Sequence, residues 1–436
     1  MKPTCTLFFL LCCFTVSQAQ TTSLGMQVKP RMEYRDGYLT LPPSGAEAGF
    51  HTNDRIRLQF AYTSPKVEVV VQPQYVYVWG QNTFNAASEA NFSMYQGYAQ
   101  MNFMGKAIDS THRLDKFGLR LGRQELNYDG GRFLSNLDWA PQGIRHDAAL
   151  FILEDNGWTL HAGAGFNQEA PRVFGTTFNG NLYKSFQMVW LHKQHQKFSG
   201  SILMFKDDFQ RFQIDTAGNS IADGVNSRIT AGTMLEFKLT DNLSIGGEFY
   251  MQRGKDNGGN TLETSLVNLH VTGVLANGKV NITPGFDIAS GSDGLNLEDT
   301  VNRFFNPTYG INHKFYGFMD YFYVASPFGN AGLQDFYVRS TFKLNSKWNT
   351  WLHLHYFASA NNINSAENPG TAADPYLGTE IDWIVNHQFA DNVQIQFGAC
   401  YMAASSTMQQ IKNVGPNGGN SGVFTYLQFM FTPKFF

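Results

Sequence analysis

The sequence predicts an all-β protein: a transmembrane antiparallel β-barrel of about 18 strands, with long extracellular loops and short periplasmic turns. Three observations predict this fold. The chain begins with the pattern of an export signal, its apolar and polar residues alternate along nearly its whole length, and its last expected strand ends in phenylalanine. Only 15% of the 436 residues are charged, yet no stretch after the signal is apolar enough for a membrane helix.

Residues 1–19 have the pattern of a secretory signal peptide. One lysine precedes a short apolar run, and Ala19 stands at the expected cleavage position. The apolar run is too short to cross a bilayer as a helix. We therefore expect a single outer-membrane β-barrel domain over residues 20–436. This domain keeps Cys400 as its one cysteine, so no intramolecular disulfide is expected.

The alternation along the chain has the period of a β-strand with one apolar and one polar face. In DRIRLQFAY, Arg55 and Arg57 lie on one face, and Ile56 and Leu58 lie on the other. The segments TMLEFKL, VNITPGFDI and VQIQFGACY repeat this pattern. The C-terminal segment GVFTYLQFMFTPKFF also alternates, and its end at Phe436 resembles the assembly signal of bacterial outer-membrane barrels.

Connection lengths predict the number of strands. Short turns that contain Asn, Asp, Gly or Pro alternate with long connections rich in Gly, Asn and Ser. The alternation stays in phase only if residues 291–331 form one long extracellular excursion, although HKFYGFMDYFYV within them has the composition of a strand. The resulting count is about 18 strands, an even number. Their centres are expected near residues 30, 58, 73, 98, 121, 149, 162, 190, 204, 234, 248, 270, 285, 338, 354, 384, 398 and 428.

A closed barrel of this size is expected to have a water-filled lumen. Every backbone polar group in lipid must be paired within the protein, so the sheet has to close, and 18 strands enclose a wide interior. Arginines on the inward face favour anions, because a guanidinium group pairs with a carboxylate in a planar fork. The expected solute-binding residues of the lumen and mouth are Arg31, Glu33, Arg35, Arg55, Arg57, Arg120, Arg123, Arg132, Arg145, Asp147 and Arg339.

These charged side chains also admit a structural interpretation, in which they form salt bridges that keep the barrel wall rigid. For any single arginine the two interpretations stay open. For Arg31, Arg35, Arg55 and Arg57, which lie on neighbouring strands, a solute-facing basic strip is favoured. The segment GRQELNYDGGRFLSNLDWAPQG is expected to be a loop folded inward that narrows the pore. Four of its side chains are expected to pair around the mouth: Arg123, Glu125, Asp129 and Arg132.

Several short motifs, taken in order, carry a family resemblance. They are R-x-E-x-R at residues 31–35, R-x-R at 55–57, LGRQELNYDGGRF, Trp139, GIRHDA, HKFYGFMD and GLQDFY. Together they resemble the alginate-export family of outer-membrane porins, from about Val28 to the C-terminus. The resemblance implies an 18-stranded barrel whose arginine-lined lumen passes an anionic polysaccharide. Acids interspersed among the arginines keep a general small-solute porin as the alternative.

The sequence carries no recognisable catalytic motif. It lacks the G-x-S-x-G, H-E-x-x-H and C-x-x-C patterns. The pairs His192/His195 and His353/His355 lack a recognisable third metal ligand, and the loops GKDNGGN and GSDGLNLED lack the spacing of a calcium site. We expect no catalytic residue, no metal and no cofactor. An outer-membrane enzyme and a purely structural barrel are less favoured alternatives.

The net charge of −3 argues against a general nucleic-acid-binding protein, which would be basic. The expected partners are outer-membrane lipids, anionic sugars or small anions, and periplasmic export proteins. The expected location is the bacterial outer membrane, which the chain crosses many times.

Overall fold

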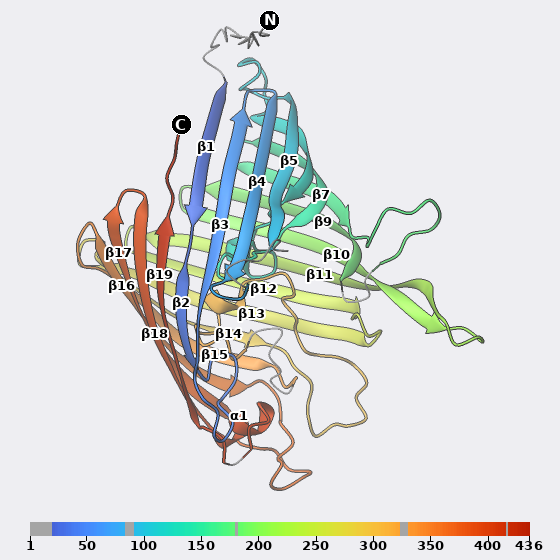
Figure 1. Cartoon of the computed structure of the whole chain (residues 1–436), viewed down its shortest axis with the longest axis vertical. Coiled ribbons are helices and arrows are strands. Elements are labelled where there is room, and N and C mark those ends of the chain that lie inside the picture. Colours follow the sequence, from blue (N-terminus) through green and yellow to red (C-terminus); the bar gives the residue numbers. More distant parts are fainter. Residues whose placement is uncertain (1–19, 83–90, 179–181, 323–329, 416) are drawn as a thin grey trace, which may run out of the picture.

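The computed structural model describes residues 20–82, 91–178, 182–322, 330–415 and 417–436, and it shows a closed antiparallel β-barrel (Figure 1). The predicted signal peptide lies outside the described residues. In the described part of the chain, Cys400 is a free, buried cysteine. The described residues contain no helix of the length and apolarity needed to cross a membrane.

The barrel wall is built from 19 strand segments. The first nine are β1 (Thr21–Val28), β2 (Arg31–Asp36), β3 (Gly49–Thr63), β4 (Val67–Val78), β5 (Phe92–Met104), β6 (Lys116–Gln124), β7 (His146–Asp155), β8 (Trp158–Phe166) and β9 (Tyr183–His195). The next five are β10 (Phe198–Ile214), β11 (Ser220–Thr240), β12 (Leu243–Lys255), β13 (Thr261–Leu275) and β14 (Val280–Ala289). The last five are β15 (Leu333–Lys343), β16 (Trp348–Ser359), β17 (Tyr376–Ala390), β18 (Val393–Ala404) and β19 (Ser421–Phe431). The described loops carry two short 3-10 turns and one α-helix: η1 (Asp129–Gly131), η2 (Asn312–Lys314) and α1 (Ser406–Ile411).

The segments β1 and β2 are two halves of one strand, so the barrel has 18 strands, as predicted. Both halves pair with β3 in one continuous register, with Val28 opposite Ile56 and Arg31 opposite Asn53. The ladder is interrupted between them because Pro30 has no backbone N–H to donate. The last strand, β19, pairs with β18 on one side and with this first strand on the other. This pairing closes the sheet and leaves no open edge in the membrane.

The predicted strand pattern is confirmed along the chain. Each expected centre falls within a strand, the first of them at the break between β1 and β2. The described part of residues 291–331 contains no strand, and HKFYGFMDYFYV begins in η2. Its aromatic side chains Phe315, Tyr316 and Phe318 are buried inside the barrel. They escape water by packing against loops and wall, which explains why a strand-like composition forms no strand here.

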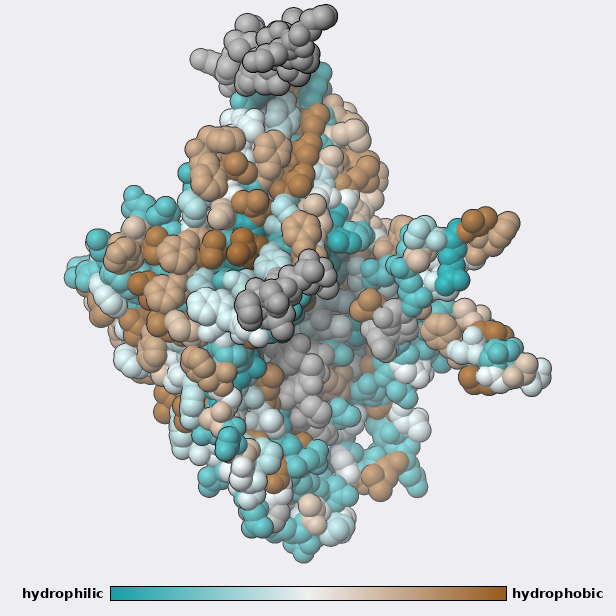
Figure 2. Space-filling view, in the orientation of Figure 1, coloured by the Kyte–Doolittle hydropathy of each residue, from teal (hydrophilic) through white to brown (hydrophobic). Residues whose placement is uncertain are grey.

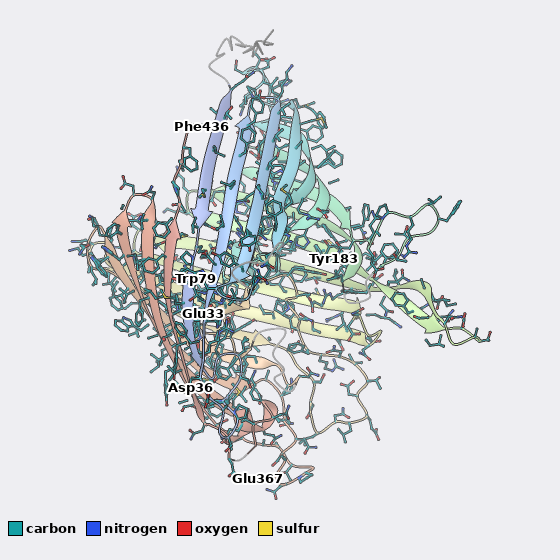
Figure 3. All side chains as sticks on the ribbon, viewed as in Figure 1. Glu33, Asp36, Trp79, Tyr183, Glu367 and Phe436 are labelled. Carbon is teal, nitrogen blue, oxygen red and sulfur yellow. The ribbon has the colours of Figure 1, made fainter. Side chains whose placement is uncertain are left out.

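The two faces of the wall differ as the alternation predicts. Exposed apolar side chains such as Leu58, Leu121 and Phe151 lie on the outer face, whereas Arg55 and Gln100 are buried on the inner face. Figure 2 shows apolar side chains gathered over the strands and hydrophilic ones at the end that carries the long loops. The C-terminal residue Phe436 lies at the end of the barrel opposite the loop residue Glu367 (Figure 3). The termini of such barrels lie in the periplasm.

Close contact between a glycine and a tyrosine on neighbouring strands gives a first testable prediction. Gly232 on β11 pairs with Tyr250 on β12, and a Cβ at position 232 would lie 2.0 Å from a carbon of the Tyr250 ring. We expect Gly232→Ala to lower the free energy of unfolding by about 1–3 kcal/mol, because the added methyl group overpacks the wall against Tyr250. Urea unfolding of the folded barrel measures this change.

Gly273→Ala is the matched control for this prediction. Gly273 also lies within a strand, but its Cβ would meet nothing closer than a backbone oxygen at 3.9 Å. We expect its effect to stay within about 0.5 kcal/mol. Equal losses for the two substitutions would contradict the packing argument.

Candidate functional site in the barrel lumen

The segment between β6 and β7 folds into the barrel and packs at its centre. Phe133 and Leu134 in this segment are fully buried, and the Phe133 ring packs edge-on against Phe205 of β10 at 5.4 Å between centroids. Leu134 also forms a parallel bridge with Tyr309, which belongs to the long connection between β14 and β15. We call residues 125–145 the first inward loop and residues 303–322 the second inward loop. The predicted inward fold of the first loop is present in the structure.

The carboxylate of Asp138, in the first inward loop, lies among three cations of the barrel wall. Its oxygens are 2.7 Å from the Lys29 ammonium, 2.6 Å from the Arg55 guanidinium and 3.9 Å from that of Arg57. Partial burial of this carboxyl opposes its ionisation, but Lys29 and Arg55 outweigh that effect and hold the pKa of Asp138 below its ordinary value. The side chain of Asp138 is still 47% exposed, whereas Arg55 is only 1% exposed.

Trp139 links the basic wall, by which we mean Lys29, Arg31, Arg35, Arg55 and Arg57, to the second inward loop. Arg31 stacks over the Trp139 ring, with its guanidinium carbon 3.7 Å from the ring centroid, and it donates a hydrogen bond to the Trp139 carbonyl at 2.8 Å. The ring of His313, in the second inward loop, stacks on the Trp139 ring with 3.7 Å between the centroids. The Trp139 indole N–H donates to the Tyr38 hydroxyl at 3.2 Å. These contacts hold the first inward loop between the barrel wall and the second inward loop.

The other predicted residues that face the lumen from β2, β3 and β6 pair with neighbours on the inner wall. Glu33 pairs with Arg31 at 2.6 Å and with Arg35 at 2.5 Å. Arg57 stacks over the Tyr95 ring at 3.4 Å, and Arg120 lies 4.0 Å from an acid on β4, Glu68. Arg31, Glu33 and Arg57 are each at most 5% exposed. These side chains face the lumen, and the inward loops and neighbouring side chains cover most of them.

Arg132 of the first loop reaches the opposite wall of the barrel. Its guanidinium is 2.6 Å from Glu248 on β12 and 2.8 Å from Asp287 on β14, and it is 2% exposed. The ring of Phe315, in the second loop, lies 3.7 Å from the guanidinium carbon. Arg132 therefore neutralises two buried carboxylates and joins both loops to the wall.

The predicted pairing of four loop side chains around the mouth is wrong. Arg123 pairs with Asp147 at 2.8 Å, and Glu125 accepts a hydrogen bond from Tyr95 at 2.6 Å. Asp129 accepts hydrogen bonds from Ser201 at 2.6 Å and from Trp190 at 2.9 Å, both on the barrel wall. The inward fold of the loop directs these side chains to different walls, so they meet wall residues instead of one another.

Arg123 and Asp147 lie on the outer face of the barrel wall, not on the solute-facing side that the sequence predicted. They are opposite each other on β6 and β7, at positions that share a face with the exposed Leu121 and Phe151. Inward positions alternate with these and include the buried Gln124. A difference of one position in a strand reverses the face of a side chain. Arg145, just before β7, donates a hydrogen bond to the carbonyl of Gln142 in the first loop.

Arg339 lies on β15, on a part of the wall that is rich in acids. Its guanidinium stacks over Tyr337 at 3.8 Å and donates a hydrogen bond to the carbonyl of Phe315 at 2.6 Å. The nearby strands carry inward-facing carboxylates that are at most 1% exposed. These residues are Asp287, Asp335, Glu380 and Asp382. This acidic wall was not predicted from the sequence, although the alternation in EIDWIVNH indicates that Glu380 and Asp382 lie on one face.

Comparisons with known proteins agree with this architecture. Residues 23–414 match the sequence profile of the family described as alginate export. No curated protein sequence matches the chain. Among solved structures, the barrel is similar to the outer-membrane protein OpdK of Pseudomonas aeruginosa, with a TM-score of 0.61 and 9% identity over 95% of this chain and 99% of that one.

Two other proteins of that organism give similar results. OpdQ has a TM-score of 0.58 at 12% identity, over 95% of this chain and 98% of that one. OpdL has a TM-score of 0.60 at 11% identity, over 95% of this chain and 99% of that one. At these identities the likeness shows the fold alone, and that fold is the porin-like barrel.

Proposed function

Because the chain belongs to the alginate export family and is an outer-membrane channel, we propose that its lumen passes anionic solutes, including an acidic polysaccharide. The family match confirms the resemblance given by the sequence motifs. The bacterial outer membrane is the location of such a barrel, and the porin-like fold indicates a channel rather than an enzyme. No catalytic step is proposed.

One observation carries the proposal: a carboxylate already occupies the basic wall. The Asp138 carboxylate lies within 4.0 Å of Lys29, Arg55 and Arg57, which is the environment that a uronate or another organic anion would require. Nearly half of the Asp138 side chain is exposed. A carboxylate on a solute can therefore compete with it for the same cations. We infer that Asp138 acts as an internal counter-ion that solute anions displace.

The basic residues also form a row along the direction of transport. Arg57 and Arg55 occupy successive inward positions on β3, and Arg31 and Arg35 flank Glu33 on β2. Successive inward positions on one strand are about 6.6–6.8 Å apart. An acidic chain can thus pass from one cation to the next without leaving all of them. Conduction requires this kind of binding, which is favourable at several sites and tight at none.

The test is the reversal potential of single channels in planar bilayers under a salt gradient, with uronate oligomers added as blockers. We expect anion preference, and we expect the double variant Arg55→Gln, Arg57→Gln to shift the reversal potential toward zero. Each lost charge-assisted hydrogen bond is worth about 1.5–3 kcal/mol, so block by the oligomers should weaken roughly 10- to 150-fold. The folded state of the variant is checked by its circular dichroism before measurement.

Arg123→Gln is the matched control, because Arg123 is an arginine on the outer face. Its reversal potential should equal that of the unchanged chain. If the unchanged channel prefers cations, or if the double variant keeps full anion preference, the basic wall does not select the solute.

The acidic wall favours a second candidate, a small-solute porin without strong anion selectivity. Asp287 is paired with Arg132, but Asp335, Glu380 and Asp382 have no lysine or arginine partner within 4.0 Å in the described part of the chain. When ionised, these carboxylates offset the charge of the basic wall. A reversal potential near zero in the unchanged chain would favour this candidate. Export of a polysaccharide would in addition need periplasmic partners that deliver it to the pore.

A further inference from the structure

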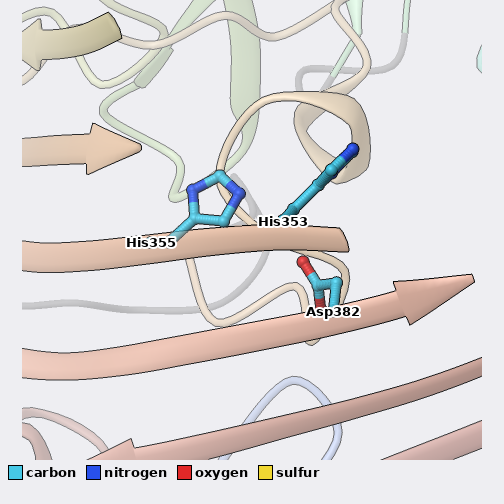
Figure 4. A group of neighbouring side chains, drawn as sticks. All are labelled: His353, His355 and Asp382. Carbon is cyan, nitrogen blue, oxygen red and sulfur yellow. The ribbon is translucent and has the colours of Figure 1, made fainter. Parts of the chain in front are cut away.

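Two histidines and an aspartate meet on the inner face of β16 and β17. His353 and His355 occupy successive inward positions of β16, and Asp382 lies on β17 directly opposite His353. The sequence presented the histidine pair without a recognisable third ligand. The strand register supplies one, from a residue 27 to 29 positions further along the chain. Figure 4 shows the three side chains on the same side of the two strands.

The geometry of this group suits a metal ion. The candidate ligand atoms, one from each residue, all lie within 4.8 Å of one another. Atoms bound to one tetrahedral Zn²⁺ at 2.0–2.1 Å are about 3.3 Å apart. Closing this difference requires rotations about the side-chain bonds of the ligands. Two imidazole nitrogens and one carboxylate oxygen form a ligand set that zinc commonly takes, with a fourth position left for water or a further side chain.

The tautomer of His355 is already set for metal binding. Its Nδ1 lies 2.9 Å from both carboxylate oxygens of Asp335, which is fully buried. A hydrogen bond from Nδ1–H to this carboxylate leaves the lone pair on Nε2 free to coordinate. Metal-binding histidines almost always have such a carboxylate or carbonyl partner on their second nitrogen.

The surroundings of Asp382 provide a second observation in favour of a cation site. Asp382 is 1% exposed, and its Oδ1 atom has no hydrogen-bond partner among the described residues. The next inward acid on β17, Glu380, is fully buried, and its Oε2 atom also has no partner there. Backbone N–H groups of the second loop serve the other oxygens, with Phe318 donating to Asp382 at 3.2 Å. Two neighbouring carboxylates in a dry site are costly unless they share a proton, as the contact between Glu380 and Asp382 allows, or gain a compensating cation.

We propose that His353, His355 and Asp382 bind one Zn²⁺ ion or a chemically similar late first-row divalent cation. Trp351, one inward position below His353 on β16, lines a cavity of about 430 Å³ beside the periplasmic turn that contains Lys347. When it is bound to these three ligand side chains, the cation joins β16 to β17. It also fixes the carboxylate that receives the second inward loop.

The experiment uses the full barrel, refolded in detergent without metal and titrated with Zn²⁺ and, separately, with Co²⁺ as a spectroscopic probe. We expect one ion per chain and a Co²⁺ absorption spectrum of tetrahedral nitrogen and oxygen coordination. His353→Gln and Asp382→Asn should each abolish this binding. The matched control is His270→Gln: His270 lies 2.8 Å from Glu236 but has no third ligand in the described structure, so binding should persist.

A positioning variant separates metal binding from a purely structural role. Asp335→Asn keeps the three ligands but removes the negative charge of the partner of His355, and it should weaken Zn²⁺ binding about 10- to 100-fold. Zn²⁺ should also raise the thermal unfolding temperature of the unchanged chain and leave that of Asp382→Asn unaltered. The unchanged chain decides the question even if variants fail to fold. An absence of Zn²⁺ binding, a Co²⁺ spectrum of oxygen ligands alone, or equal loss in His270→Gln would overturn the proposal.

Discussion

Arg132→Met is expected to destabilise the folded barrel by about 3–5 kcal/mol and to raise its conductance. Breaking a buried ion pair on one side leaves an uncompensated charge, and here Glu248 and Asp287 both lose their cationic partner. Methionine keeps most of the volume against Phe315, so the loss arises from charge and not from a cavity. The first inward loop loses its anchor to β12 and β14. Urea unfolding measures the stability, and bilayer recording measures the conductance.

Two further variants separate the effect of buried charge from other effects of the substitution. Arg123→Met removes an exposed pair on the outer face, with both side chains more than a third exposed, and should cost less than about 1 kcal/mol. The triple variant Arg132→Met, Glu248→Gln, Asp287→Asn removes the whole buried group and should recover much of the lost stability. If the single variant is as stable as the unchanged chain, or the triple variant is the least stable of all, the buried charges are not the cause.

The strands of this barrel could be predicted because two solvents act on the wall at once. Because lipid lies outside the barrel and water inside, apolar and polar residues must alternate along each strand. In DRIRLQFAY this alternation shows which residues face lipid and which face the lumen. The turns then fix which end of the barrel each connection occupies. The second inward loop was placed by this phase alone, against its own strand-like composition.

The side-chain partners could not be predicted, because they depend on distances across the barrel. Nothing near Arg132 in the sequence indicates that Glu248 and Asp287 are its partners, 116 and 155 positions away. Asp382 meets His353 only through the register between β16 and β17. Arg123 was assigned to the wrong face because a shift of one position reverses the direction of a side chain. Whether a segment forms a strand depends on its own residues. The register between strands and the docking of loops depend on residues far away in the sequence.

The two inward loops connect walls of opposite charge, and this arrangement accounts for much of the buried polar network. The first loop presents Asp138 to the basic wall and Arg132 to the acidic wall. Each of these two loop charges therefore has the sign opposite to the wall that it meets. Changing the charge of one such contact should release the loop on that side and leave the other side in place.

Asp138→Asn tests this at the basic wall, and we expect it to raise both conductance and anion preference. Lys29 and Arg55 lose their charged partner, and each lost charge-assisted hydrogen bond is worth about 1.5–3 kcal/mol. The population of channels with the loop released should grow roughly 10- to 150-fold for one such bond. The freed cations then face the lumen. Unchanged conductance in Asp138→Asn would show that the loop is held by its buried aromatic contacts instead.

The same contact makes the channel sensitive to acid, and the sign follows from the pKa of Asp138. Lys29 and Arg55 hold that pKa below the ordinary value of 3.8, whereas in a released loop the carboxyl titrates near that value. The docked loop therefore has its full electrostatic stabilisation above about pH 3.8, and it loses this as the pH falls through the lower pKa of the docked state. Conductance of the unchanged chain should rise over that acidic range, measured by bilayer recording at stepwise lower pH. Asp138→Asn should already conduct at the higher level and show no such rise, since it has no carboxyl to protonate; a parallel rise in both would assign the acid response to other groups of the lumen.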